Sequence, residues 1–478
     1  MVKKRIAATA PAFVALSMVV AACGSNTSKT AQGASASSGT ASASQCNLSA
    51  LTTAAHPVNI TFWESANGSA TSPTSEEYLM LKLVKQFNSS QSQVHVTDVN
   101  QQSYFDGTWT PYLNSLQNHT EPNILFFDDY YVQDAVDSKS FIPVASCIAA
   151  DKYSTSDFLP KSILQQSVNG TLWGMPYTGA GYIMYYNQKA LTKAGISAPP
   201  TTFAQVVADA AKFKAAGYSD GISVYNQPAL LQLFDGIARQ YYVNNQNGRA
   251  GKSATAAALD NAASLAYVQD VHQMVADGTA KGFSATGPGT SGFDNILAVG
   301  NGQAGLTFAP SGTLSLVEAV APSYPKATIE VAPLPSVGGV NLGLPSEGQS
   351  LYLPKSSTPA QLAASWEFLK YLVSATQMAT FDAGTGFVRV RTSASQEPVI
   401  QSLWAKNPAY KVSWDEMSAG PANNATAGPL EGPVTQIDND VANMLAKLDT
   451  DPTAVPSTLL SQLSSQVTAA IASYGSAS

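Results

Sequence analysis

The stretch from Gly170 to Gly217 constrains the fold of this chain most. It begins with two short apolar runs, Gly170–Pro176 and Tyr182–Tyr186, which have the residue types of buried β-strands. Asn187 follows the second run and ends it. Because only a few residues separate the two runs, they predict a strand–turn–strand unit.

Two helices are expected in the second half of this stretch. The first is built from small and apolar residues and ends at Gly195, since the two prolines that precede Thr201 exclude further helix there. Thr201 or Thr202 then caps a second helix, in which apolar residues recur at helical spacing until Gly217. Strands followed by helices in this order predict an α/β chain with a mostly parallel sheet.

The same stretch resembles the central segment of the family 1 extracellular solute-binding proteins, the sugar-capturing subunits of ABC importers. The shared pattern is G-x-x-W-G-x-P-Y from Gly170, followed by Y-Y-N, A-G-I and P-P-T. The resemblance implies an α/β fold with two lobes, the type II periplasmic-binding-protein-like fold, in which the chain crosses between the lobes three times at a hinge.

Further segments extend the resemblance over nearly the whole mature chain. One is Gly384–Arg391, where Arg389 stands in place of the proline that is usual in the family. The resemblance places lobe 1 at residues 46–143 and 307–352 and lobe 2 at residues 145–304 and 356–478.

The N-terminus has the pattern of an export signal. Residues 1–22 combine a basic start with an apolar run too short to span a bilayer stably. The run ends in Val-Ala-Ala before Cys23, which matches a bacterial lipobox and predicts a lipidated cysteine; the alternative is an ordinary signal peptide with a chance cysteine. Residues 23–45 are rich in Ser, Ala, Thr and Gly and predict a flexible tether.

Two further cysteines, Cys46 and Cys147, lie in the mature body. In an exported protein an isolated pair predicts one disulfide bond. The alternative is a pair of buried free thiols.

Composition and motifs exclude several function classes. A net charge of −7, with only 12% charged residues, provides no basic surface for nucleic acid. The four histidines form no H-x-x-H or H-E-x-x-H pattern and no G-x-S-x-G occurs, so we expect neither a metal site, nor a cofactor, nor an enzyme. One enzymatic alternative stays open, a secreted carbohydrate-active enzyme in which Asp128, Asp129 and Glu347 supply the two carboxyl groups of glycoside hydrolysis.

Aromatic and polar side chains recur at the ends of predicted strands, which also include Val58–Trp63, Pro122–Tyr131 and Gly221–Val224. Aromatic rings can pack against the C–H face of a sugar, while carboxylates and amides bond to its hydroxyls. The alternative for each aromatic residue is a place in the core. From these positions and from the resemblance, the candidate ligand-binding residues are Trp63, Glu64, Asn67, Asp128, Asp129, Tyr130, Trp173, Tyr177, Tyr225, Gln227, Ser311, Glu347, Gly348 and Arg389.

The expected function is capture of a neutral mono- or oligosaccharide and its delivery to the membrane subunits of an ABC transporter. Trp63 and Asp128 are expected to contact the ligand from one lobe and Tyr177 from the other. A glycerol-phosphate or polyol binder is the alternative; residues 424–436 carry no basic side chain for a phosphate, although Arg389 keeps an anionic ligand open. The protein is expected to be a monomer, anchored through Cys23 to the outer face of the cell membrane.

Overall fold

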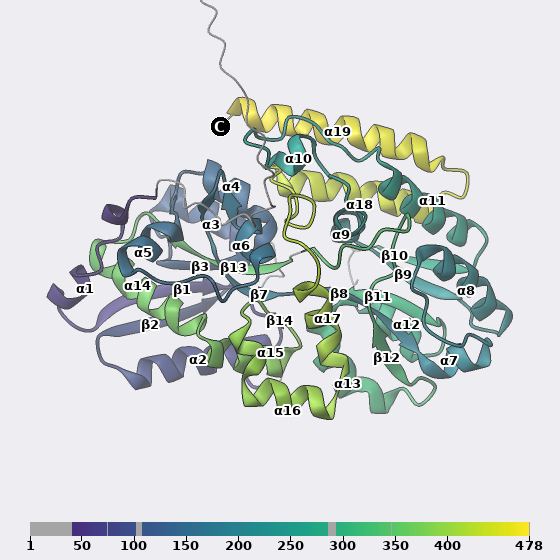
Figure 1. Ribbon diagram of the computed structural model, residues 1–478, viewed down its shortest axis with the longest axis horizontal. Helices are drawn as coiled ribbons and strands as arrows, with labels where there is room; N and C mark the ends of the chain where they lie inside the picture. Colours follow the sequence, from purple (N-terminus) through teal and green to yellow (C-terminus); the bar gives the residue numbers. More distant parts are fainter. Residues whose placement is uncertain (1–40, 74, 102–107, 285–292, 346, 478) are drawn as a thin grey trace, which may run out of the picture. The chain divides into compact units, whose positions relative to one another are not determined.

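The computed structural model describes residues 41–73, 75–101, 108–284, 293–345 and 347–477, all within one unit, Ser38–Ser478 (Figure 1). Cys23 and the predicted signal peptide lie outside the described residues. No helix in these ranges is both long and apolar enough to cross a membrane.

The largest sheet has the strand order β14-β7-β13-β3-β1-β2, and β4 pairs with β13. β1 runs parallel to β2 and β3, whereas β13 runs antiparallel to β3, β4 and β7. Its strands are β1 (Val58–Glu64), β2 (Val94–Asn100), β3 (Ile124–Asp128), β4 (Phe141–Ile142), β7 (Met175–Gly179), β13 (Gly348–Pro354) and β14 (Val388–Arg389).

Helices belonging to two separate parts of the chain pack around this sheet. They are α1 (Ala50–Thr53), α2 (Glu76–Ser90), α3 (Trp109–Asn118), α4 (Val132–Asp137), α5 (Val144–Asp151), α6 (Pro160–Gln165), α14 (Pro359–Leu372) and α15 (Ala375–Thr385), with the 3₁₀ turns η1 (Ala43–Gln45) and η3 (Asp129–Tyr131).

Both faces of the sheet are covered, as the strand β3 illustrates. Successive side chains on a strand point to opposite faces. Phe126 therefore joins the core cluster that contains Phe368 of α14, and Phe127 joins a second cluster that contains Trp109 of α3. Every residue of β3 is buried as a result.

The remaining strands form smaller sheets. β8 (Tyr182–Asn187) pairs antiparallel with β11 (Leu306–Pro310) and β12 (Ile329–Ala332), and β9 (Ile222–Asn226) pairs parallel with β10 (Ala280–Ser284). A short hairpin joins β5 (Ser167–Val168) to β6 (Thr171–Leu172). The helices and turns of this part are α7 (Gln188–Lys193), α8 (Phe203–Ala215), α9 (Pro228–Ile237), α10 (Asn244–Gly248), α11 (Ala262–Ala276), α12 (Asp294–Gly300), η4 (Ser311–Thr313), α13 (Leu314–Val320) and η5 (Ala321–Ser323).

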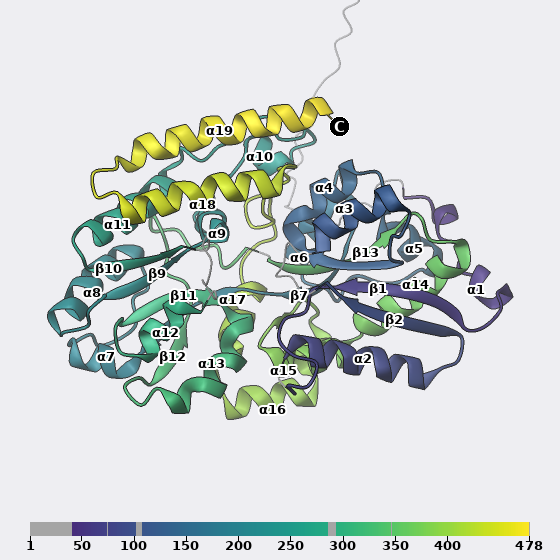
Figure 2. The same cartoon turned by 180° about the vertical axis from the view of Figure 1, so that it is seen from behind.

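The C-terminal part of the chain is helical. Its last two helices, α18 and α19, lie side by side in both views (Figures 1 and 2). The elements are η6 (Ser393–Gln396), α16 (Pro398–Lys406), α17 (Ala409–Ser418), α18 (Val434–Thr450) and α19 (Pro456–Ala477).

Local predictions hold for the second strand, which is β8, and for the start of α8, but the first strand differs from its prediction. Thr202 caps α8, with the Gln205 side chain completing a capping box, so the second of the two candidate threonines is confirmed. The first predicted strand is wrong in extent, because the chain forms the hairpin strand β6 and then a separate strand, β7. Both β7 and β8 pair antiparallel with their neighbours, so the expectation of a mostly parallel sheet is wrong for this segment.

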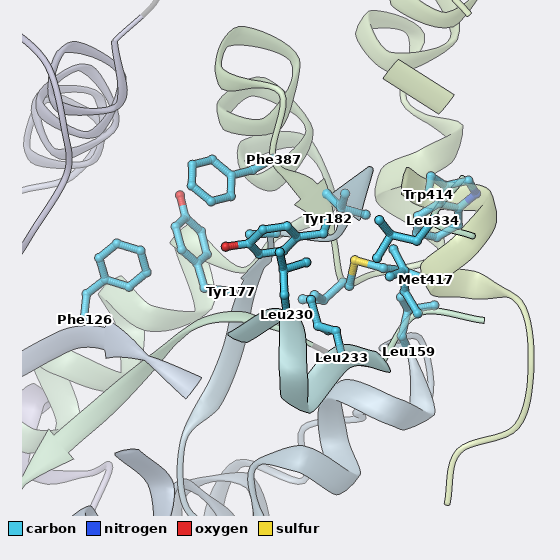
Figure 3. Close-up of a cluster of buried hydrophobic side chains, with 14 of the residues drawn as sticks. Phe126, Leu159, Tyr177, Tyr182, Leu230, Leu233, Leu334, Phe387, Trp414 and Met417 are labelled. Carbon is cyan, nitrogen blue, oxygen red and sulfur yellow. The ribbon is translucent and has the colours of Figure 1, made fainter. Parts of the chain in front are cut away.

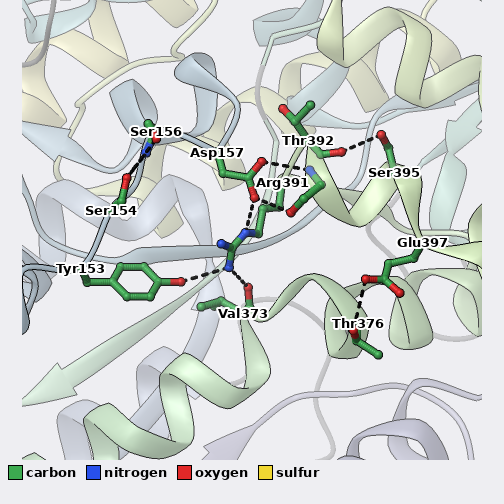
Figure 4. A network of polar contacts seen from close by, with 11 residues as sticks. Tyr153, Ser154, Ser156, Asp157, Val373, Thr376, Arg391, Thr392, Ser395 and Glu397 are labelled. Carbon is green, nitrogen blue, oxygen red and sulfur yellow. Dashed lines mark hydrogen bonds and ion pairs between the residues drawn. The ribbon is translucent and has the colours of Figure 1, made fainter.

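A half-buried polar network fixes the segment that follows β14 (Figure 4). Arg391 Nε donates to Asp157 Oδ2 at 2.6 Å, and its Nη1 donates to the Tyr153 hydroxyl at 3.0 Å and to Val373 O at 2.8 Å. The last arginine of the motif Gly384–Arg391 therefore has a structural role, since its N–H groups bond within the protein.

Cys46 and Cys147 form a disulfide bond that joins the turn after η1 to α5. The Ser146 hydroxyl donates to Gln45 Oε1 at 2.9 Å beside it. The residue ranges given above for the two lobes and the tether stay a prediction. In the structure α14, which falls in the range predicted for lobe 2, packs on β1, which falls in the range predicted for lobe 1, and α15 packs on α2 in the same way.

Candidate functional site

The strands β1, β3 and β13 bring three groups of predicted site residues to one edge of the large sheet. β1 and β3 are parallel, so their carboxyl ends, with Trp63 and Asp128, lie at the same edge. β13 is antiparallel to β3 and starts at this edge, with Gln349 opposite Asp128. This edge, with its polar and aromatic side chains, is the candidate site.

A buried acidic group lies at this edge. Glu347 is 8% exposed, and burial raises its pKa to about 8. An interaction with the Tyr130 hydroxyl lowers this pKa, and the nearby Asp129 raises it. Asp129 is also buried, which raises its pKa to about 7, and the Ser350 hydroxyl donates to its Oδ1 at 2.5 Å. Asp129, Tyr130 and Glu347, which are three of the predicted site residues, therefore lie close together. They are poorly solvated and can form hydrogen bonds with a polar molecule.

Because the pKa of Glu347 is raised, we expect its contribution to the free energy of unfolding to depend on pH. A carboxyl group whose folded pKa exceeds its unfolded value costs stability as pH rises from the unfolded to the folded pKa, here from 4.5 to about 8. Glu347→Gln is therefore expected to leave the free energy of unfolding of the ligand-free protein unchanged near pH 4.5 and to raise it by about 1 to 3 kcal/mol near pH 8. Urea denaturation at both pH values measures this.

The matched control for this variant is Glu330→Gln, at an exposed glutamate on β12. It should change stability equally little at both pH values. A Glu347→Gln variant that is destabilised near pH 8 would contradict the assignment of Glu347 as a buried, costly carboxylate.

Three of the predicted aromatic residues share one environment. Trp63, Tyr130 and Trp173 are partly buried, and all pack against the core cluster that contains Phe127 and Tyr352. Each residue is partly exposed and packs in part against this cluster. This is the arrangement that an aromatic platform for a ligand requires.

Glu64, the last residue of β1, and Asn67 after it each make hydrogen bonds inside the protein, although Glu64 Oε1 has no partner among the described residues. Glu64 is fully buried, accepts a hydrogen bond from Ala66 N, and has its pKa raised to about 8 by burial and by the nearby Asp98. The backbone and side-chain amides of Asn67 both donate to Glu76 Oε2, at 3.1 and 3.4 Å. That Glu64 and Asn67 contact a ligand stays a prediction.

Residues from β8 and β9 connect to the acidic group. The Tyr182 hydroxyl donates to Gln227 Oε1, and Tyr225 also interacts with Gln227. Tyr182 in turn interacts electrostatically with Tyr130. The predicted residues Tyr225 and Gln227 are thus linked through Tyr182 to the edge of the large sheet.

The small residues Ser311 and Gly348 lie where chain segments approach closely. Ser311 is buried, its backbone N donates to Gly181 O at 2.9 Å, and its hydroxyl has no hydrogen-bond partner in the described chain. A Cβ on Gly348 would lie only 1.9 Å from Thr178 O, so glycine is required there for strand pairing.

Tyr177 is a core residue, contrary to its prediction as a ligand platform (Figure 3). Its side chain is 0% exposed, and its ring lies 5.5 Å from both Phe126 and Phe381. Its strand, β7, belongs to the same sheet as β1 and β3, so Tyr177 does not face Trp63 and Asp128 from a second sheet. The proposed site is built without it.

Arg389 also lies inside the protein. It is 1% exposed, its guanidinium centre is 5.0 Å from the Trp404 ring and 5.6 Å from the Trp414 ring, and its Nε is 3.7 Å from Asp382 Oδ2. Burial lowers its pKa and the Asp382 carboxylate opposes this. Burial raises the pKa of the Asp382 carboxyl to about 7, and Arg389 Nε and Nη1 have no hydrogen-bond partner in the described chain.

Sequence reasoning missed Gln349 and Thr178. Gln349 is opposite both Asp128 and Thr178 in the sheet, and neither end of its buried amide has a hydrogen-bond partner among the residues described; the same holds for the Thr178 hydroxyl. A glutamine and a serine at the start of an otherwise mostly apolar strand are the signal that could have found this position. Leaving such groups unpaired is costly, so a polar molecule at this edge would satisfy them.

A profile of the family described as bacterial extracellular solute-binding protein matches residues 82–412. Among curated proteins, the sn-glycerol-3-phosphate-binding periplasmic protein UgpB of Yersinia pseudotuberculosis is 25% identical over 405 residues, which cover 82% of this chain and 88% of that protein. The relatives found in this comparison are substrate-binding proteins.

Solved structures show the same fold. UgpB from Mycobacterium tuberculosis, in complex with glycerophosphocholine, superposes with a TM-score of 0.71 at 16% identity and covers 87% of this chain and 98% of its own. The cyclic α-maltosyl-1,6-maltose binding protein from Arthrobacter globiformis gives a TM-score of 0.69 at 18% identity, over 87% of this chain and 100% of its own. The chain therefore has the fold of the type II periplasmic binding proteins, as predicted.

In the described ranges, no group of three or more His, Cys, Asp or Glu side chains is arranged to hold a metal ion.

Proposed function

Because the chain belongs to the bacterial extracellular solute-binding proteins, we propose that it captures a neutral mono- or oligosaccharide and hands it to the permease of an ABC importer. Proteins of this kind deliver small molecules to such permeases, and family members are extracellular or periplasmic. The protein acts as a monomer and catalyses no reaction in this proposal.

One observation carries the choice of a neutral sugar. The acidic group of Asp129, Tyr130 and Glu347 adjoins the partly buried rings of Trp63 and Trp173. Rings pack against the C–H face of a pyranose, and carboxylates accept hydrogen bonds from its hydroxyls. These acidic side chains offer a phosphate no positive charge, and Arg389, the buried arginine considered above, has the Asp382 carboxyl 3.7 Å from its Nε.

The second candidate is sn-glycerol-3-phosphate or a glycerophosphodiester. The names of the similar proteins favour it, since one binds sn-glycerol-3-phosphate and one was solved with glycerophosphocholine. The acidic side chains Asp129 and Glu347 argue against it, because an anionic ligand beside them would disfavour their ionised forms further.

A thermal-shift screen separates these candidates. Maltose, maltotriose, sn-glycerol-3-phosphate and glycerophosphocholine are each added to the purified protein, and product formation is followed in parallel. We expect a sugar to raise the melting temperature without being cleaved, and Trp63→Ala to abolish the shift. A shift only with the phosphate compounds supports the second candidate, and cleaved sugar supports a carbohydrate-active enzyme.

The lipid anchor is part of the proposal and rests on the sequence before Cys23, outside the described residues. Cys23→Ala is expected to release the protein from membranes without changing its melting temperature, because a lipidated N-terminal cysteine carries enough acyl chains for stable anchoring. Fractionation after a carbonate wash measures this. A Cys23→Ala protein that stays in the membrane fraction would refute the lipobox interpretation.

A further inference from the structure

The segment of residues 421–433, between α17 and α18, is held against α10 by an unusual backbone turn. Asn245, Gln246, Asn247 and Gly248 all have positive φ angles, between 53° and 69°. Consecutive left-handed residues other than glycine are unfavourable, so surrounding contacts must hold this turn. In both views α10 lies beside the start of α18 (Figures 1 and 2).

Those contacts come from the segment itself. Leu430 N donates to Asn247 O at 3.0 Å, and Asn247 Nδ2 donates to Asn424 O at 3.1 Å. Arg249, which follows the turn, donates to Ala427 O and Gly428 O, at 3.0 and 2.7 Å. The left-handed turn and Arg249 thus fix the path of the segment up to Leu430.

Arg249 also ties the segment to α6. Its remaining N–H groups donate to Leu164 O, Gln165 O and Ser167 O, at 2.8 to 3.0 Å. These five hydrogen bonds all go to backbone carbonyls and none to a carboxylate. Arg249 therefore holds the backbone of the segment in position, and none of these bonds neutralises a carboxylate.

The residue that follows this fixed path is Glu431. Its side chain is 2% exposed, and Oε1 accepts from Gln232 Nε2 at 3.3 Å, whereas Oε2 has no hydrogen-bond partner in the described part of the chain. Burial raises its pKa well above the ordinary value, and the carboxylates of Asp438 and Asp134 add to this. A carboxylate oxygen placed so rigidly and left without a partner is costly unless a polar molecule bonds to it.

Glu431 adjoins the candidate site. Asp438, which interacts with Glu431, also interacts with Tyr130, and Tyr130 interacts with Glu347. The Tyr131 hydroxyl lies 3.2 Å from the Thr435 hydroxyl, which joins η3 to the start of α18. The segment therefore lies beside the acidic group at the edge of the large sheet.

We propose that Glu431, with Gln232 beside it, forms a further part of the binding site that accepts a hydrogen bond from a hydroxyl or ammonium group of the solute and rejects phosphate. This inference rests on the proposed function. Carboxylates from the segment and from the sheet edge then face the solute from two sides, which disfavours an anionic group there.

Calorimetric titration of the wild-type protein and of Glu431→Gln with maltose, maltotriose, sn-glycerol-3-phosphate and glycerophosphocholine tests it. Replacement of the Glu431 carboxyl group by an amide should weaken binding of the preferred sugar about tenfold or more, as expected for loss of a buried hydrogen bond to the solute. It should also narrow the difference in affinity between that sugar and sn-glycerol-3-phosphate.

The matched control is Glu416→Gln, at a partly buried glutamate of α17 that interacts with Lys161. It should leave sugar affinity unchanged. Sugar binding that is equal in the wild type and Glu431→Gln overturns the role of Glu431 and leaves the proposed function standing. A wild-type protein that binds only the phosphate compounds, or none of the four, overturns both the neutral-sugar proposal and the role of Glu431.

Discussion

Replacement of both Cys46 and Cys147 by serine is expected to lower the free energy of unfolding by about 4 to 5 kcal/mol, from the chain-entropy estimate for a long loop. The bond joins residues 101 positions apart, so the unfolded chain gains much conformational freedom when it is lost. Urea denaturation of the mature protein measures the difference, and reduced wild-type protein serves as the comparison if the double variant folds poorly.

Labelling of thiols tests the same bond directly. Denatured, unreduced protein exported by its host should contain neither Cys46 nor Cys147 in free form. If both thiols are labelled, or if reduction leaves the stability unchanged, the bond does not constrain the exported protein.

Tyr177→Ala is expected to cost about 3 to 5 kcal/mol of folding free energy, by analogy with other large aromatic residues. The Tyr177 ring is fully enclosed between Phe126 and Phe381, so its removal leaves a cavity in the core. Tyr177→Phe is the matched control and should be neutral or stabilising, because the Tyr177 hydroxyl has no hydrogen-bond partner among the described residues.

Ligand affinity completes this experiment. At a temperature where Tyr177→Ala is folded, its affinity for the preferred solute should match that of the wild type. A variant with unchanged stability and strongly reduced affinity would restore Tyr177 to the binding site and contradict its place in the core.

The sequence predicted the local elements around Tyr177 better than their packing. The apolar runs and the cap at Thr202 depend on neighbouring residues, so local rules find them. Whether Tyr177 faces a ligand or the core depends on what covers its strand. β7 lies between β13 and β14, and α15 supplies Phe381 from more than 200 positions away in the chain, about which local sequence says nothing.

The candidate site was predictable in part for the same reason. Strand ends with Trp63, Asp128 and Tyr130 could be found, because polar residues after apolar runs mark them. The pairing of Glu431 with Gln232 joins residues 199 positions apart, and Gln349 gains its significance only from its neighbours on β3 and β7. Such groups are identified by their unpaired atoms in the folded chain.

Native mass spectrometry of the protein purified from its exporting host tests the central claim most directly, since a solute-binding protein can retain its ligand through gentle purification. We predict that wild-type protein carries a neutral carbohydrate and that Trp63→Ala, purified in the same way, carries none. A phosphate-containing solute on the wild-type protein, or the same carbohydrate on both proteins, would contradict a neutral-sugar site built around Trp63, Tyr130 and Glu347.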